Sequence, residues 1–303
     1  MNNLQNFFDK EYSRFITKGS FQSIYRFSIR FLSNLILPIY FLIIRAKKNK
    51  EDNTVIVSLT TFPDRISRFW LVIECILRQD VRPYKIYVWL AKEQFPEEME
   101  NLPKKLVNYH NKGLVNFVFV EEDFRSHKKY YYAFKEFDKY KIITLDDDII
   151  YPSFLLRKLL ETSEKHPKSI CCLRGYEVLH NEFGVLLPYK KWNIIRGSYG
   201  PALDFFHTSG GGTLYKVNFF DEEVFNEKVF SKHCLYADDV WLNVMAQFKR
   251  TSTVKVDYYS NLLPVMWNGK FRLSSNNVNS GGNDEQLANL IRYYNVSEES
   301  MFK

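Results

Sequence analysis

The sequence lacks the cysteine patterns that cross-link small domains or bind zinc. Its 303 residues include four cysteines, and no two of them form a CxxC pair. Cys171 and Cys172 are neighbours inside an apolar segment typical of a strand, while Cys75 and Cys234 stand alone. We therefore expect reduced thiols in the core of a cytoplasmic protein, not disulfides or zinc ligands. No cleavable signal peptide, internal repeat or low-complexity linker is evident.

The body of the chain also lacks net charge. With 46% hydrophobic and 25% charged residues, the composition indicates a folded globular protein of one large domain or two. Residues 1–50 carry nine bases and two acids, which accounts for the whole net charge of +7 and leaves residues 51–303 formally neutral. A nucleic-acid-binding body would carry its own basic footprint, so we expect no nucleic-acid partner. The nine bases are Lys10, Arg14, Lys18, Arg26, Arg30, Arg45, Lys47, Lys48 and Lys50.

The N-terminal segment has no long uncharged span. The uncharged run 31–44 has fourteen residues and contains Pro38, whereas a spanning helix usually needs about twenty. Residues 21–44 predict an amphipathic helix, so we interpret residues 1–50 as a basic segment that associates with a membrane surface and lies in the interface. A helix packed on the body and a spanning helix stay open as alternatives. The polar stripe is Gln22, Arg26, Arg30 and Ser33, and the apolar face includes Phe21, Ile24, Tyr25, Phe31 and Leu32.

From residue 54 onward, strand patterns alternate with helix patterns. Their strand centres lie about thirty residues apart, the length of a βαβ unit. This spacing predicts an α/β fold with a mostly parallel sheet flanked by helices on both faces. We divide it into a nucleotide-binding half, 51–152, and an acceptor half, 153–303. The predicted strands are 54–60, 84–90, 114–120, 141–145 and 254–258, and the predicted helices are 64–79, 128–137, 237–248 and 283–294.

Three adjacent carboxylates, Asp146, Asp147 and Asp148, follow the predicted strand 141–145. Clustered carboxylates repel one another and raise each other's pKa unless a cation lies among them. Ligands of open α/β sheets bind at the carboxyl ends of the strands. The residues themselves therefore predict a divalent cation with a phosphate-bearing ligand at this edge. An acidic turn and a structural calcium site are the alternatives.

Five motifs in order resemble the GT-A-fold glycosyltransferases, most of all the family-2-like enzymes of bacterial capsule and lipopolysaccharide biosynthesis. The resemblance covers roughly residues 54–250. It implies transfer of a sugar from a nucleotide-sugar donor to a surface-polysaccharide or lipid-linked glycan acceptor, with Mn²⁺ or Mg²⁺ as cofactor. The motifs are VIVSLTTFPDRI at 55–66, RQDVRP at 78–83, LDDDIIYP at 145–152, SGGGTLYK at 209–216 and ADDVWL at 237–242.

The resemblance also implies roles for the acidic residues. The aspartates look like the family's DXD motif, with Asp148 as the direct metal ligand, Asp146 acting through water or the donor ribose, and Asp147 auxiliary. ADDVWL looks like the motif that supplies the general base of inverting members, which assigns the base to Asp239 with Asp238 beside it. Both residues are also plausible helix-start acids, with Asp238 as a possible N-cap.

Donor contacts are implied for several other positions. Gly210 to Gly212 would let the backbone approach the donor, although three glycines also suit a flexible turn. His207 is a weaker candidate for the phosphate or the metal. Family-2 enzymes often bind the base with a carboxylate after the second strand, but here that strand ends in an apolar run and Glu93 is the nearest substitute, so UDP is only a default. The other donor candidates are Thr60, Thr61 and Arg65 for the nucleotide, and Lys128 and Lys129 for the diphosphate.

We therefore expect an inverting, metal-dependent hexosyltransferase-type enzyme on the cytoplasmic face of a bacterial inner membrane. Two rivals use the same residues differently. A metal-dependent phosphatase or nucleotidyltransferase would use the aspartates without needing a base at Asp239. A non-catalytic, membrane-bound scaffold would keep the fold and bind no nucleotide.

Overall fold

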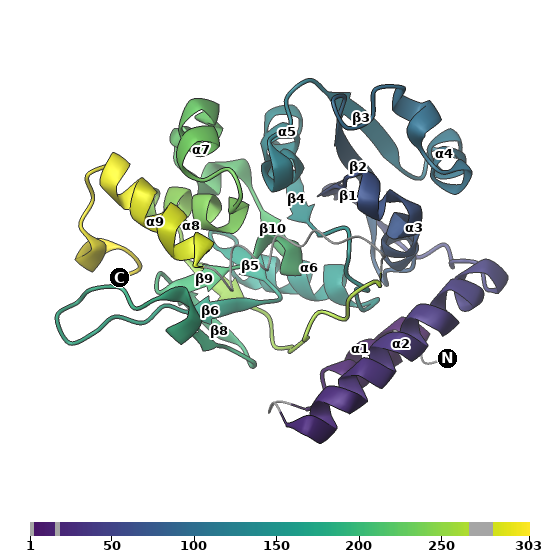
Figure 1. Cartoon of the computed structure of the whole chain (residues 1–303), viewed down its shortest axis with the longest axis horizontal. Helices are drawn as coiled ribbons and strands as arrows, with labels where there is room; N and C mark the ends of the chain where they lie inside the picture. Colours follow the sequence, from purple (N-terminus) through teal and green to yellow (C-terminus); the bar gives the residue numbers. More distant parts are fainter. Residues whose placement is uncertain (1–2, 16–18, 267–280) are drawn as a thin grey trace.

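The computed structural model describes residues 3–15, 19–266 and 281–303 (Figure 1). Lys18, one of the nine N-terminal bases, lies outside these residues. The helices are α1 Leu4–Tyr12, α2 Ser20–Ile43, α3 Pro63–Leu77, α4 Lys104–Asn111, α5 Lys128–Glu136, α6 Leu155–Lys165, α7 Glu227–His233, α8 Asp238–Phe248 and α9 Gly282–Tyr293. The strands are β1 Glu51–Thr60, β2 Arg82–Ala91, β3 Asn116–Val120, β4 Lys141–Thr144, β5 Ile170–Cys172, β6 Gly175–Glu177, β7 Asn193–Ile194, β8 Tyr199–Ala202, β9 Phe205–His207, β10 Thr213–Tyr215 and β11 Thr253–Lys255.

The predicted α/β fold with a mostly parallel sheet is confirmed. The central sheet has the strand order β3-β2-β1-β4-β10-β5-β11-β8. The pairs from β3 to β4 are parallel, and β11 is parallel to β5. Strand β10 runs antiparallel between β4 and β5, and strands β7, β6 and β9 form a second small sheet. The fold therefore has a parallel first half and a mixed second half.

Hydrophobic cores cover both faces of the central sheet. Alternating side chains of β1 point to opposite sides, because Val55 and Val57 belong to one core while Ile56 belongs to the other. The first core packs against α3, α4 and α6, and the second against α5, α8 and α9. All four cysteines are free and buried, as the sequence predicts.

Helices α3 and α8 both begin without a side-chain cap. The residue before α3 is Phe62, and Pro63 occupies the first helical position, so Asp64 lies inside the first turn. Helix α8 begins at Asp238 after Ala237 and has no side-chain cap. The carboxylate of Asp238 bonds elsewhere in the fold, which removes capping as its explanation.

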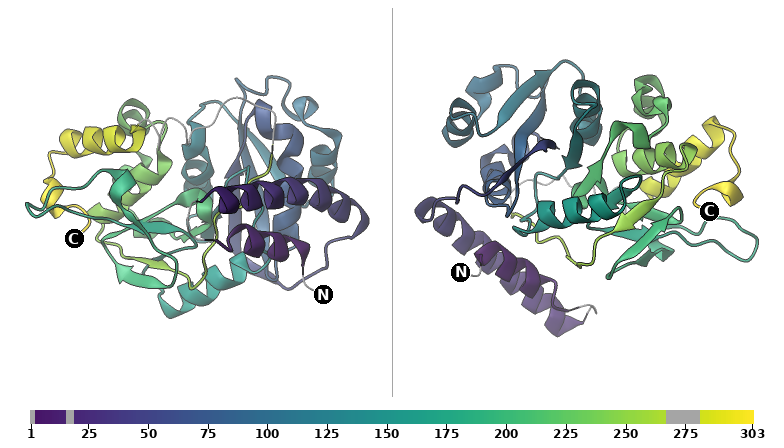
Figure 2. Two further views of the ribbon diagram at one scale, coloured as in Figure 1. Left: turned by 60° about the horizontal axis from the view of Figure 1, so that its bottom comes forward. Right: turned by 180° about the vertical axis from the view of Figure 1, so that it is seen from behind.

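Helix α2 lies along the outside of the molecule beside α1 (Figure 2). Its polar stripe faces the body, where Ser33 and Asn34 are buried together with Leu37 and Phe41. Its apolar side faces outward, and Ile24 is 67% exposed. The helix is therefore packed on the body, as one of the alternatives holds, but most of its large apolar side chains face outward. By length and composition α2 is long enough to cross a membrane.

Candidate active site

A cavity of about 660 Å³ opens at the carboxyl edge of the parallel strands. Thr60 at the end of β1 and the three aspartates after β4 line it, and so do the first residues of α3, α5, α8 and α9. Thr61, which is buried, lies beside Thr60 in the lining. The volume of the cavity lies in the range of cavities that hold small-molecule ligands.

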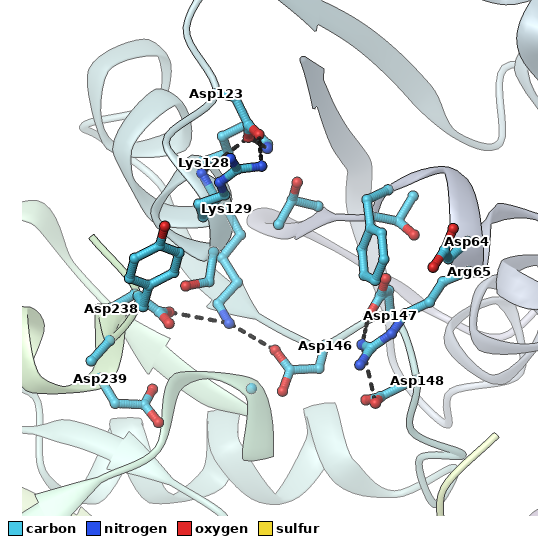
Figure 3. A pocket seen from close by; sticks show the side chains of 18 of the residues that line it. Asp64, Arg65, Asp123, Lys128, Lys129, Asp146, Asp147, Asp148, Asp238 and Asp239 are labelled. Atoms are coloured by element: carbon cyan, nitrogen blue, oxygen red, sulfur yellow. Dashed lines mark hydrogen bonds and ion pairs between the residues drawn. The ribbon is translucent and has the colours of Figure 1, made fainter. Parts of the chain in front are cut away.

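The structure gathers most of the predicted site residues in this cavity (Figure 3). Residues distant in sequence from both halves of the chain meet there, which is the arrangement that the parallel-sheet prediction requires. The predicted residues in the lining are Thr60, Thr61, Arg65, Lys128, Lys129, Asp146, Asp147, Asp148, Asp238 and Asp239.

Lys129 joins the two acidic groups of the site. Its ammonium lies 2.7 Å from Asp146 Oδ1 and 3.1 Å from Asp238 Oδ2. Its side chain is 4% exposed, so it is not the solvated helix-start lysine that the sequence also allows. Because both contacts are charge-assisted, Lys129 fixes the end of β4 to the start of α8.

Arg65 holds the other two aspartates. Its guanidinium pairs with Asp147 and lies 3.0 Å from Asp148 Oδ2. Asp147 is nearly buried, and its Oδ2 atom has no hydrogen-bond partner. Asp148 is 28% exposed, and burial raises its pKa to about 7 despite the opposing effect of Arg65.

Asp238 and Asp239 at the start of α8 differ in the direction in which their pKa values are shifted. Burial would raise the pKa of Asp238, but Lys129 lies beside it and the Ser209 hydroxyl donates to it at 2.6 Å, and together they hold that pKa well below its usual range. Burial and the charge of Asp238 raise the pKa of Asp239 to about 7. The backbone N–H of Ser209 donates to Asp239 Oδ1 at 2.7 Å. The environment therefore favours the charged form of Asp238 and the protonated form of Asp239.

The glycine loop contributes differently from the prediction. Gly210 lines the cavity, and a Cβ atom there would lie 1.8 Å from Asp146 Oδ2. Gly211 and Gly212 are buried behind the lining and do not reach the ligand space. Gly212 has φ of 100° and packs against Leu155. The close approach that requires glycine is therefore at Gly210.

Two weaker candidates lie outside the cavity. His207 is buried, its backbone N–H bonds Asn243, and burial lowers its pKa to about 3. Glu93 is exposed and does not line the cavity. The neighbouring Gln94 does line it, and its amide donates to Asp123 at 2.9 Å.

Asp123 is the main residue that sequence reasoning missed. It is nearly buried, and Lys128 and Arg125 also pair with it, so Lys128 is already neutralised. Its signal was available in the sequence, because it follows β3 as the three aspartates follow β4. Tyr189, Tyr236 and Asn283 complete the acceptor-half wall, and no motif marked them.

Comparisons with known proteins add little. No protein-family model matches the chain, and no curated protein matches it. The crystal structure of a 4-diphosphocytidyl-2C-methyl-D-erythritol synthase is similar to this chain, with a TM-score of 0.39 and 11% sequence identity over 69% of this chain and 90% of that one. A likeness this distant carries no information about activity.

Proposed function

We propose that the protein is a metal-dependent glycosyltransferase of the GT-A type. The observation that carries the proposal is the cavity itself, in which the Asp146–Asp148 group lies opposite the Asp238–Asp239 pair. One group suits a cation and a donor diphosphate, and the other suits deprotonation of an acceptor hydroxyl. The resemblance of the sequence motifs to those of GT-A glycosyltransferases indicates that the transferred group is a sugar.

The charges in the cavity support a requirement for a divalent cation. Among the described residues, seven aspartates and four bases, Arg65, Arg125, Lys128 and Lys129, line the cavity, so carboxylates are in excess. A nucleoside diphosphate would be repelled by this excess of negative charge unless Mn²⁺ or Mg²⁺ entered with it.

The available ligands fit such a cation. No group of three or more His, Cys, Asp or Glu side chains among the described residues could hold a metal alone. Mg²⁺ commonly uses one or two carboxylates together with substrate phosphates and waters. Asp148 and Asp146 would hold it, and the unpartnered Oδ2 of Asp147 lies next to them. The bound cation would neutralise the departing diphosphate.

The acceptor half supports an inverting reaction. Asp239 in its charged form would take the proton of the acceptor hydroxyl as that oxygen attacks the anomeric carbon and the nucleoside diphosphate leaves. Asp238, held charged by Lys129, keeps the affinity of Asp239 for that proton high. We place the reaction on the cytoplasmic face of a bacterial inner membrane, with a surface-polysaccharide or lipid-linked glycan as acceptor.

The test is thermal unfolding with UDP, GDP, CDP, dTDP and ADP, each with Mn²⁺ and with EDTA. A ligand at 100 times its Kd stabilises the fold by about 2.7 kcal/mol. We expect one nucleotide to raise the melting temperature only with metal, and Asp148→Asn to abolish the increase. Glu93→Gln, at an exposed position outside the cavity, is the matched control and should behave as wild type.

The same experiment separates the rival functions. A scaffold would give no shift with any nucleotide, and that result would overturn the proposal. A phosphatase or nucleotidyltransferase would turn over a phosphate ester or a nucleoside triphosphate without an acceptor sugar, and Asp239→Asn would leave that turnover intact.

A further inference from the structure

Most of the exposed large hydrophobic side chains among the described residues lie on helix α2 and at its C-terminal end. Eleven large hydrophobic side chains between positions 21 and 44 are more than a third exposed. Exposed apolar patches of this extent mark interaction sites. The eleven are Phe21, Ile24, Phe27, Phe31, Leu32, Leu35, Ile36, Ile39, Leu42, Ile43 and Ile44.

The opposite side of α2 is fixed to the body by polar contacts. The Asn34 amide donates to the Pro264 carbonyl at 3.0 Å, and Asn34 Oδ1 accepts from the Met266 N–H at 2.7 Å. Arg78 lies 4.4 Å from the Phe41 ring and donates to the carbonyls of Phe41 and Ile44. The two bonds from Arg78 satisfy carbonyls that the last turn of any helix leaves unpaired.

A third contact depends on Pro38, which lies inside the helix. Proline has no N–H, so the carbonyl four residues earlier, that of Asn34, has no partner within the helix. Arg68 of α3 donates to this carbonyl at 3.1 Å. The body is therefore attached at the middle and the C-terminal end of α2, and the helix cannot leave it without unpairing several polar groups.

Helix α2 and the segment that follows it to residue 50 carry charge of one sign. Residues 20–50 contain six bases and no acid. Four of the bases, Arg45, Lys47, Lys48 and Lys50, follow directly on the end of the helix and are exposed. A second copy of the chain would bring the same positive charge to the contact, whereas anionic lipid headgroups complement it.

We propose that the exposed face of α2 docks on an anionic lipid bilayer, with the helix lying in the plane of the interface. The outward face enters the boundary of the acyl chains, and the basic segment 45–50 contacts the headgroups. The contacts of Asn34, Arg68 and Arg78 hold the other face on the folded body, which favours the in-plane orientation over a spanning one. This inference does not rest on the proposed activity, since no cavity residue takes part in it.

The test is sedimentation of the full chain with sealed vesicles of phosphatidylethanolamine and phosphatidylglycerol in a 3:1 ratio. We expect Ile39→Glu/Ile43→Glu to reduce partitioning at least tenfold without lowering the melting temperature, because both side chains are exposed. Phe183→Glu is the matched control, since Phe183 is 74% exposed but lies far from α2 in sequence and outside the patch. It should bind as wild type.

Charge and orientation have separate readouts. Replacing Lys47 and Lys48 with glutamine should weaken binding by about fivefold per charge and leave binding to uncharged phosphatidylcholine vesicles unchanged. For orientation, all four native cysteines are buried, so Ile24→Cys and Ile43→Cys each accept a fluorophore selectively. External dithionite should quench both labels if the helix lies in the plane.

Three results would overturn the proposal. Protection of one label but not the other would indicate a spanning helix. Equal vesicle binding by the glutamate variant would remove the apolar face from the contact. A wild-type dimer that the glutamate variant converts to monomer, without vesicle binding by either, would assign the face to a second copy. Nucleotide stabilisation is measured without lipid, so either proposal can fail while the other stands.

Discussion

At the scale of single residues, the most constrained group is the ammonium of Lys129. It is buried between a carboxylate after β4 and another at the start of α8. Lys129 lowers the pKa of Asp238, whereas burial and the charge of Asp238 raise the pKa of Asp239 against the opposing effect of Lys129. Two adjacent aspartates thus acquire different protonation behaviour, as catalytic acid–base pairs require.

The raised pKa of Asp239 gives a pH prediction. A general base works only when deprotonated, so kcat/KM should increase with pH below about 7 and level off above it. Asp239→Asn should lower kcat by about 10²- to 10⁴-fold, with nucleotide stabilisation retained. The measurement is initial rate against pH for both proteins.

A flat wild-type profile between pH 5.5 and 8 would contradict the assignment of Asp239 as the base. Glu93→Gln is the control, because Glu93 is exposed and outside the cavity. It should keep the wild-type profile in both slope and midpoint.

The site could be predicted from the sequence where charge follows a strand. Asp146–Asp148 and the Asp238–Asp239 pair stand next to strong apolar patterns, so both groups were predicted to be in the site and both lie in the cavity. The ion pairs of Lys129 and Arg65 depend on three-dimensional neighbours, which one sequence does not reveal. Asp123 was missed because a carboxylate was sought after β2, whereas the structure places an aspartate that lines the cavity after β3.

At the scale of elements, Arg68 of α3 compensates for the hydrogen bond that Pro38 removes from α2. The proline leaves the Asn34 carbonyl without an intrahelical partner, and the arginine donates to it. A residue that weakens an isolated helix thereby creates an attachment point between that helix and the body.

A double-mutant cycle tests this coupling. Arg68→Met should destabilise the wild type by about 1–3 kcal/mol, because a largely buried carbonyl loses its donor. In a Pro38→Ala background the new N–H serves that carbonyl, so the same change should cost less. Urea unfolding of the four proteins gives the difference, and additivity of the two changes would contradict the coupling.

The sequence predicted the elements of the parallel half better than those of the mixed half. Strands β1 to β4 have buried runs bounded by turns, and their predicted ranges differ from the observed ones by a few residues. Strand β10 has three residues and follows three glycines, which gives too short a pattern to distinguish from a loop. Helix α2 was predicted as a helix, but only the structure shows that its polar stripe faces the body.

At the scale of the whole molecule, the N-terminal residues 1–50 are integrated with the body. Gln5 of α1 donates to the Tyr151 carbonyl at 3.0 Å. Buried Asp9 accepts from Tyr258 and from Ser260, both at 2.6 Å. Deleting residues 1–50 would therefore leave several buried polar groups without partners, in addition to exposing apolar surface.

We expect this deletion to lower the free energy of unfolding by at least about 3 kcal/mol. The Ile39→Glu/Ile43→Glu protein keeps all the polar contacts and should unfold like wild type. Calorimetry of the three proteins compares them. A deletion protein as stable as wild type would show that residues 1–50 are only a tethered segment.

Residues 263–266 lie between α2 and the aspartates. Asn34 pairs with it on one side, and on the other side the Val265 N–H donates to the Asp148 carbonyl at 2.7 Å. With α2 seated on a bilayer, the protein itself sets the height of the aspartates above the lipid. In such an arrangement, the protein would select acceptors by the length of the spacer between the lipid anchor and the acceptor hydroxyl. We expect vesicle-bound acceptors with graded spacers to be used unequally, and the same acceptors in detergent to be used alike.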